Sequence, residues 1–210
     1  MISKSSKIVI LALVLSSYSP ISPVNLAPPA LAKADQQSAT TPPDVLEEQI
    51  NNKSYQVSKM LVRCRPEQIW QILSDYNSAP SIFHTLKKCQ LLADKGSTKL
   101  MHHEIRPSGL MATFHYDLEV KETGHRMLEW HRVNGDFKEV EGFWKLEPAD
   151  AGRSTLVTYA SYVNGGIFMP QALIKRQFRI DMPAVMMALK NQAETTTQIA
   201  ARRTEGIRTP

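Results

Sequence analysis

The spacing of apolar residues changes once along this chain, from a two-residue period to a helical period, and the change falls at Pro170. Before Pro170, short segments of β-forming residues alternate with breaks rich in glycine, proline and asparagine, which is typical of strands joined by short loops. After it, apolar residues recur every three or four positions between Ile174 and Ala193, which predicts one long amphipathic helix. A chain in this order must bury one face of a sheet against a single helix.

Seven segments have the composition of strands. They are residues 55–63, 89–93, 99–106, 110–120, 126–133, 137–146 and 155–163. The alternation is clearest in 110–120, where apolar residues share one face and polar residues share the other. Such a strand has a dry side and a wet side, as expected in an antiparallel sheet with one solvated face.

Two short helices are expected after the first strand. Pro66 suits the first position of a helix, where its missing N–H is not needed, and the apolar spacing that follows ends before Pro80. A second short turn is expected at residues 81–86. In the last helix, Pro183 lacks an N–H and should kink the helix or divide it in two.

These elements predict an α+β fold, in which a curved seven-stranded antiparallel sheet wraps around a long C-terminal helix. Too few strands remain for a second sheet to cover the dry face, so the helix must cover it. A curved sheet seldom closes completely over one helix. The gap predicts an apolar cavity between the sheet and the C-terminal helix.

The N-terminal residues have the layout of a secretory signal peptide: a positive start, an apolar run at residues 8–15, and Ala32-Lys33-Ala34 at a cleavage spacing. The run is shorter than the roughly 20 residues that span a bilayer. We therefore expect export across the cytoplasmic membrane, to the periplasm, an equivalent lumen or the outside; a retained N-terminal anchor is the alternative. The expected organisation is a signal peptide at 1–34, a linker at 35–52, one domain at 53–197 and a flexible tail at 198–210.

The charge balance argues against nucleic acid as a partner. The chain has 25 basic and 20 acidic residues, but three of the lysines lie in the first 34 residues, which leaves 22 basic residues against 20 acidic ones. So small an excess gives no broad electrostatic footprint for a phosphate backbone. In an exported protein, Cys64 and Cys89 could form one disulfide or remain as two buried thiols.

Several short motifs, in a fixed order, carry a resemblance to a known superfamily. They are Arg65-Pro66-Glu67-Gln68-Ile69-Trp70, Asp75-Tyr76, Pro80, Gly135-Asp136, Gly142-Phe143-Trp144-Lys145-Leu146-Glu147-Pro148, residues 155–159 and Pro170. With them the sequence resembles the helix-grip (START-like, SRPBCC) superfamily, in particular its polyketide cyclase/dehydrase-like group and the subgroup that contains coenzyme Q-binding proteins. The resemblance covers about residues 54–194.

The resemblance implies that a hydrophobic small molecule or lipid, such as an isoprenoid quinone or a pigment, binds between the sheet and the last helix. Some members of the superfamily are aromatase/cyclases, so a cyclase or dehydrase enzyme is the alternative. An interaction domain with a filled pocket is a third hypothesis.

The expected lining of the cavity consists of inward aromatic residues and methionines of the last helix, for which ordinary core packing is the alternative. These residues are Phe114, Tyr116, Trp144, Tyr159, Phe178, Met182 and Met186. A glycine pair and an apolar triplet directly before the last helix suggest a gate at the cavity mouth that makes transient contact with a membrane, or else a lid that folds back. This segment is Gly165, Gly166, Ile167, Phe168 and Met169.

The titratable residues indicate neither a metal site nor a cofactor, and no catalytic residue is assigned. The six histidines show no familiar ligand spacing, and the adjacent His102 and His103 should point to opposite faces of a strand. Two pairs, Glu104 with Arg106 and Glu129 with His131, could act as acid and base if they faced the cavity. Ion pairing on the solvent side is the alternative.

Overall fold

The computed structural model describes residues 41–206, excluding the side chains of Phe168 and of residues 200–206. The predicted signal peptide at residues 1–34 and the last four residues of the predicted tail lie outside the described range. Within it, no helix is both long enough and apolar enough to cross a membrane.

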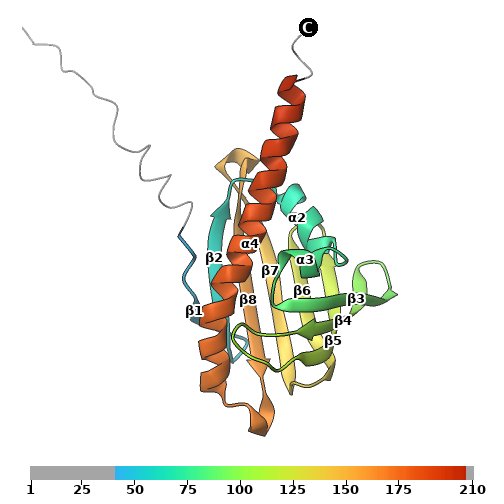
Figure 1. Cartoon of the computed structure of the whole chain (residues 1–210), viewed down its shortest axis with the longest axis vertical. Coiled ribbons are helices and arrows are strands. Elements are labelled where there is room, and N and C mark those ends of the chain that lie inside the picture. The colour runs from blue at the N-terminus through green and yellow to red at the C-terminus, as the bar shows by residue number, and fades with distance from the viewer. Residues whose placement is uncertain (1–40, 207–210) are drawn as a thin grey trace, which may run out of the picture. The chain divides into compact units, whose positions relative to one another are not determined.

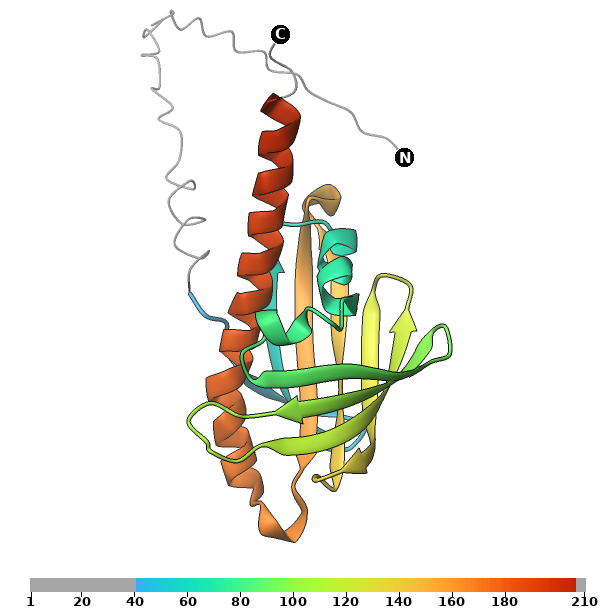
Figure 2. The ribbon, with the colours of Figure 1, turned by 45° about the vertical axis from the view of Figure 1, so that its right-hand side comes forward.

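One antiparallel sheet of eight strands forms most of the domain (Figure 1). The strands are β1 (Leu46–Ile50), β2 (Lys53–Val62), β3 (Leu86–Asp94), β4 (Thr98–Ile105), β5 (Phe114–Thr123), β6 (Met127–Gly135), β7 (Glu139–Ala149) and β8 (Ser154–Asn164). Their order across the sheet is β1-β2-β8-β7-β6-β5-β4-β3, so β2 pairs with β8 and the remaining neighbours are consecutive in the chain. Figure 2 shows the sheet curving beside the long C-terminal helix.

Three α-helices and two short 3-10 turns complete the described fold. They are α2 (Pro66–Ser74), α3 (Ala79–Ile82), η1 (Asp150–Gly152), η2 (Gly166–Phe168) and α4 (Gln171–Gly206). Helix α2 begins at Pro66, and the Gln68 side chain accepts a hydrogen bond from the Arg65 N–H (3.3 Å), which satisfies a donor at the helix start. A large antiparallel sheet with two short helices and a long final helix confirms the predicted helix-grip fold.

The sheet has eight strands instead of the predicted seven, because β1 lies within the segment expected to be a linker. Its residues are mostly polar, so their composition resembles that of a linker. Asn51 and Asn52 both have positive φ (50° and 62°), a conformation that suits a two-residue hairpin turn. The edge strand is also held by ion pairs from Glu48 to Lys59 (2.9 Å) and from Glu47 to Lys175 (2.8 Å).

Helix α4 is continuous through Pro183, so the predicted alternative of two separate helices is wrong. The helix continues to Gly206, well beyond residue 197, where the domain was predicted to end. Met182 and Met186, on either side of the proline, are both buried, and the burial of apolar side chains around Pro183 offsets the missing hydrogen bond. The first residues of the predicted flexible tail are therefore helical.

The loop between β4 and β5 is longer than predicted, because residues 110–113 are not in a strand and β5 begins at Phe114. From Phe114 onward the predicted alternation holds: Tyr116, Leu118 and Val120 are buried, whereas His115 and Glu119 are exposed. Register in this part of the sheet follows the apolar face.

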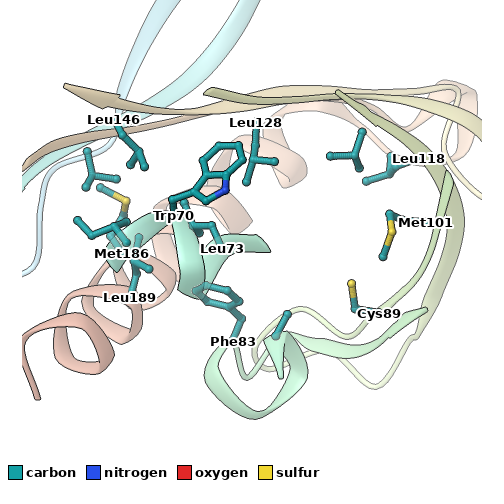
Figure 3. Close-up of a cluster of buried hydrophobic side chains, with 14 of the residues drawn as sticks. Trp70, Leu73, Phe83, Cys89, Met101, Leu118, Leu128, Leu146, Met186 and Leu189 are labelled. Carbon is teal, nitrogen blue, oxygen red and sulfur yellow. The ribbon is translucent and has the colours of Figure 1, made fainter. Parts of the chain in front are cut away.

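The main hydrophobic core lies between the concave face of the sheet, α2 and α4. Figure 3 shows Trp70 and Leu73 of α2 near Leu146 of β7 and Met186 and Leu189 of α4. Both cysteines are buried free thiols, so the disulfide alternative is not realised in this fold.

Candidate functional site

A cavity of about 280 Å³ lies between the concave face of the sheet and helices α3 and α4. Strands β3 to β8 all contribute to its wall, and most of the side chains that line it are apolar. In Figure 3, Cys89 and Leu118 lie on the side of the interior opposite Trp70 and Phe83. The gap expected between a curved sheet and one helix is therefore present.

Stacked aromatic rings form part of the wall. Trp144 and Tyr159 are register partners on β7 and β8, and their rings stack with centroids 4.2 Å apart and planes 11° apart. Trp130 on β6 lies 6.0 Å from Tyr159, and Phe137 lies 5.0 Å from Phe114. Aromatic pairs in these geometries are favourable beyond the area they bury, so the wall is a pre-formed, partly flat surface.

Six of the seven predicted lining residues border the cavity. They are Phe114, Tyr116, Trp144, Tyr159, Phe178 and Met182. The exception is Met186, which has no exposed surface and lies in the core near Trp70 and Leu189 (Figure 3). Met186 lies one helical turn beyond Met182, where α2 fills the space next to α4, so the prediction that it lines the cavity is wrong.

A thiol and an imidazole in the wall were missed by the sequence analysis. Cys89 on β3 and His103 on β4 are register partners, and Cys89 Sγ lies 3.3 Å from His103 Nε2. Burial raises the pKa of the Cys89 thiol to about 12. Burial, with a smaller contribution from His102, lowers the pKa of His103 to about 4. Both groups are therefore neutral at neutral pH, and the thiol is not an activated nucleophile.

His103 could have been found from the sequence. In β4 it has the same parity as the apolar residues Met101 and Ile105, which predicts the inward face.

Two tyrosines in the wall also keep their protons. Burial raises the pKa of Tyr159 to about 12 and raises that of Tyr116 well above its usual range. Their phenol groups are thus neutral and can both donate and accept hydrogen bonds.

The loop between β4 and β5 is fastened to α4 beside the cavity. The Asp181 carboxylate accepts hydrogen bonds from the Ser108 N–H (3.2 Å to Oδ1) and from the Gln177 side-chain amide (2.8 Å to Oδ2). The same amide donates to the Ser108 carbonyl (3.1 Å). The cavity is bordered by Pro107 and Leu110 of this loop and by Gln177 and Asp181 of α4. These hydrogen bonds therefore hold one part of the cavity wall in place.

The predicted gate segment forms the other connection to α4. A Cβ on Gly165 would lie 2.4 Å from the Cβ of Met169, so a glycine is needed where Met169 turns back to line the cavity. Gly166 has φ +71°, and its N–H donates to the Asn164 side chain (3.0 Å). Ile167 instead is 89% exposed. The segment therefore has an inward residue and an outward one; the side chain of Phe168 lies outside the described residues.

Neither proposed acid–base pair lines the cavity. On the outer face of the sheet, Glu104 lies 3.5 Å from Lys88 and His131 lies 3.8 Å from Glu119. Their parity is opposite to that of the lining residues His103 and Trp130. The hypothesis that these pairs act inside the cavity is wrong, and the alternative of outward ion pairs holds for Glu104 and His131.

The fold is shared by solved structures of low sequence identity. Zhui aromatase/cyclase from Streptomyces sp. R1128 is 13% identical (TM-score 0.59), with 67% of this chain and 93% of that chain covered. A START superfamily protein from Mycobacterium smegmatis is 19% identical (TM-score 0.59), with 68% and 98% covered. A STAR-related lipid transfer protein from Xanthomonas axonopodis is 13% identical (TM-score 0.60), with 74% and 95% covered.

No curated protein matches the sequence. The family model described as "Polyketide cyclase / dehydrase and lipid transport" matches residues 62–190, which is more than half of the chain and includes nearly the whole wall of the cavity. The chain therefore belongs to the polyketide cyclase/dehydrase and lipid transport family, a group within the START-like superfamily of hydrophobic ligand-binding and cyclase-like domains.

Proposed function

We propose that the protein is an exported module that binds or transfers a hydrophobic small molecule or lipid in the cavity between the sheet and α4. The observation that carries this proposal is the cavity itself, whose wall is mainly apolar and aromatic. Binding would remove apolar surface from water, which contributes about 25 cal/mol per Å² before the costs of ordering the ligand. The similar Xanthomonas protein is a STAR-related lipid transfer protein by name, which supports the same class of ligand.

The wall favours a ligand with a flat ring and a neutral polar group, such as an isoprenoid quinone or a pigment. The stacked Trp144 and Tyr159 provide a planar surface. His103 and Tyr116, 5.8 Å apart between ring centroids, are neutral hydrogen-bonding groups that suit a carbonyl or hydroxyl better than a charged headgroup. An aliphatic tail would occupy the apolar remainder of the cavity.

The export part of the proposal rests on residues 1–34, which have the three regions of a secretory signal. The N-terminal sequence and mass of the protein from fractionated cells test it. A mature N-terminus near Asp35 in the extracytoplasmic fraction supports export with cleavage. An uncleaved chain that begins at Met1 and is found in the membrane fraction supports a retained anchor. The intact chain in the cytoplasm would contradict both.

The gate is a further part of the proposal. Ile167 and Met111 are 89% and 93% exposed, on the two loops whose other residues, Met169 and Leu110, border the cavity. We infer that these tips enter the outer layer of a membrane while a ligand passes the cavity mouth. A transient contact with the membrane interface needs only a few exposed apolar side chains.

The binding function is tested by mass spectrometry of organic extracts of the natively purified protein, together with titration of a hydrophobic fluorescent probe. The variant Val163→Phe adds bulk to the cavity wall, whereas Val133→Phe makes the same change at a position that is 54% exposed on β6. We expect an extracted apolar compound, and probe affinity that falls at least tenfold in Val163→Phe and is unchanged in Val133→Phe. Equal affinities in the two variants would contradict binding in this cavity.

A cyclase or dehydrase is the second candidate, because a neutral imidazole beside a thiol lies in the wall and could donate or accept a proton. The similar Streptomyces protein is named an aromatase/cyclase, which supports this class of reaction. The two candidates differ in the fate of the ligand: a carrier releases the extracted compound unchanged, whereas an enzyme converts it and loses turnover in His103→Phe. The third hypothesis, a filled pocket, is disfavoured by the cavity volume.

A further inference from the structure

Three metal-ligating side chains come together on the outer face of the sheet, away from the cavity. His102 and Glu104 lie on β4, and His115 lies on β5 directly opposite Glu104 in the register. Each offers one ligand atom, and the three atoms all lie within 4.8 Å of one another. Glu104 Oε1 is 3.7 Å from His102 Nε2 and 4.0 Å from His115 Nδ1.

These separations are close to those of a metal site. In a tetrahedral zinc site with bonds of about 2.1 Å, neighbouring ligand atoms lie about 3.4 Å apart. Side-chain rotations must shorten the two measured distances by about half an ångström and must bring the two nitrogens, which lie within 4.8 Å of each other, to the same spacing. The side chains are only partly exposed, which limits their freedom: 25% for His102, 28% for Glu104 and 51% for His115.

Neighbouring groups orient two of the candidate ligands. Asp117, the register partner of His102, lies 2.8 Å from His102 Nδ1, which leaves Nε2 directed to Glu104. A carboxylate on the second nitrogen is the partner that metal-binding histidines usually have. The backbone N–H of His115 donates to Asp136 Oδ2 (2.7 Å), which fixes the backbone that carries the third ligand.

We propose that His102, Glu104 and His115 bind a divalent transition-metal ion of the zinc type, with Asp117 as a positioning residue. Two imidazole nitrogens and one carboxylate suit Zn²⁺, Co²⁺ or Ni²⁺ and not Ca²⁺ or Mg²⁺, which prefer all-oxygen sites. Three protein ligands leave a fourth position facing solvent, so the ion could also take a ligand from a partner molecule. The spacing of the sequence does not reveal the site, because only the register of two strands brings the third ligand to the other two.

Removal of Lys88 should change the metal affinity in the opposite direction from removal of a ligand. Its Nζ lies 3.5 Å from Glu104 Oε1, the oxygen that faces both histidines. A lysine there competes with a metal cation for the same carboxylate. Removing the lysine should therefore strengthen metal binding, whereas removing a ligand should weaken it.

The test is calorimetric titration of the untagged, chelator-treated protein with Zn²⁺ at pH 7.5, and visible spectroscopy with Co²⁺. We expect one ion per chain, affinity at least tenfold lower in His102→Ala, Glu104→Gln and His115→Ala, and higher affinity in Lys88→Ala. Asp117→Asn should lower affinity by roughly 10- to 100-fold, as outer-sphere partners do. His131→Ala is the matched control, because His131 is an exposed histidine on the neighbouring strand β6.

Far-UV circular dichroism of each variant separates lost binding from lost folding, and the substituted side chains all lie on the outer face. The proposal is overturned if His102→Ala binds Zn²⁺ as tightly as the unaltered protein, or if His131→Ala weakens binding as much as His102→Ala does. Absence of stoichiometric binding in the unaltered protein would overturn it as well.

Discussion

Cys89 on β3 and His103 on β4 face each other across two paired strands, with the thiol sulfur 3.3 Å from the imidazole Nε2. The pair lies in the cavity wall, where burial favours the uncharged form of each group, so neither member is charged at neutral pH. An uncharged polar pair in an apolar wall can orient a neutral ligand without the cost of burying an ion.

The first prediction concerns acid stability. The pKa of His103 is about 4 in the folded protein against 6.5 for the unperturbed group, so between these values the unfolded chain binds more protons than the folded one. Stability should therefore fall as the pH drops from 6.5 toward 4, with a contribution from His103 of up to about 3 kcal/mol. Urea unfolding at pH 7 and pH 5 should show a smaller difference in His103→Gln than in the unaltered protein.

The control for this prediction is His131→Gln, which removes an exposed histidine. Its difference between pH 7 and pH 5 should match that of the unaltered protein. A His103→Gln variant that loses as much stability on acidification as the unaltered protein would show that His103 is not the group responsible.

The second prediction concerns Gly142 on β7. A Cβ at this position would lie 2.4 Å from the Ala160 carbonyl oxygen and 2.4 Å from the ring of Trp130, which lines the cavity. Gly142→Ala should lower the free energy of unfolding by about 1–3 kcal/mol, as overpacking does, and should weaken probe binding by displacing the indole. Gly96→Ala is the comparison, because no atom lies within 4 Å of its added Cβ and only its positive φ opposes the change. Unimpaired probe binding in Gly142→Ala would show that the Trp130 ring does not shape the cavity.

The third prediction concerns the bonds between Asp181 and Ser108, which hold the β4–β5 loop to α4. Asp181→Ala should lower the free energy of unfolding by about 1 kcal/mol. A hydrogen bond to a carboxylate is worth more than a neutral one, but its partial burial reduces that contribution. It should also speed hydrogen exchange at the Ser108 amide and raise both the association and dissociation rates of a bound probe. Asn191→Ala, on the exposed face of α4, should change none of these. Unaltered exchange at Ser108 would mean that the loop is held by other contacts.

The fourth prediction tests the gate. Ile167→Asp places a charge on an exposed apolar tip, so it should reduce co-sedimentation with phospholipid vesicles several-fold, because a charged group resists transfer from water to the bilayer interface. Val133→Asp makes a comparable change at an exposed position on β6 and should leave co-sedimentation unaltered. If both variants sediment with vesicles as the unaltered protein does, membrane contact through this segment is excluded.

The class of fold and most of the cavity wall could be predicted from the sequence, because both follow from local periodicity. A two-residue period in β5 and a helical period in α4 place Phe114, Tyr116, Phe178 and Met182 on inward faces, where the structure has them. Strand β1 and the part of α4 beyond residue 197 were not predicted. Pairing at a sheet edge and extension of a helix depend on the adjacent strand or the preceding turn, so they are not evident from the composition of the segment itself.

What only the tertiary structure decided is which residues meet. Met186 obeys the same helical period as Met182, yet α2 covers it and the cavity does not reach it. The pairs Cys89–His103 and Glu104–His115 lie 14 and 11 positions apart, and strand register alone brings each pair together. The sequence by itself determined which faces are buried, because burial follows the period of a single element, whereas contacts between elements depend on register and packing that no single segment encodes.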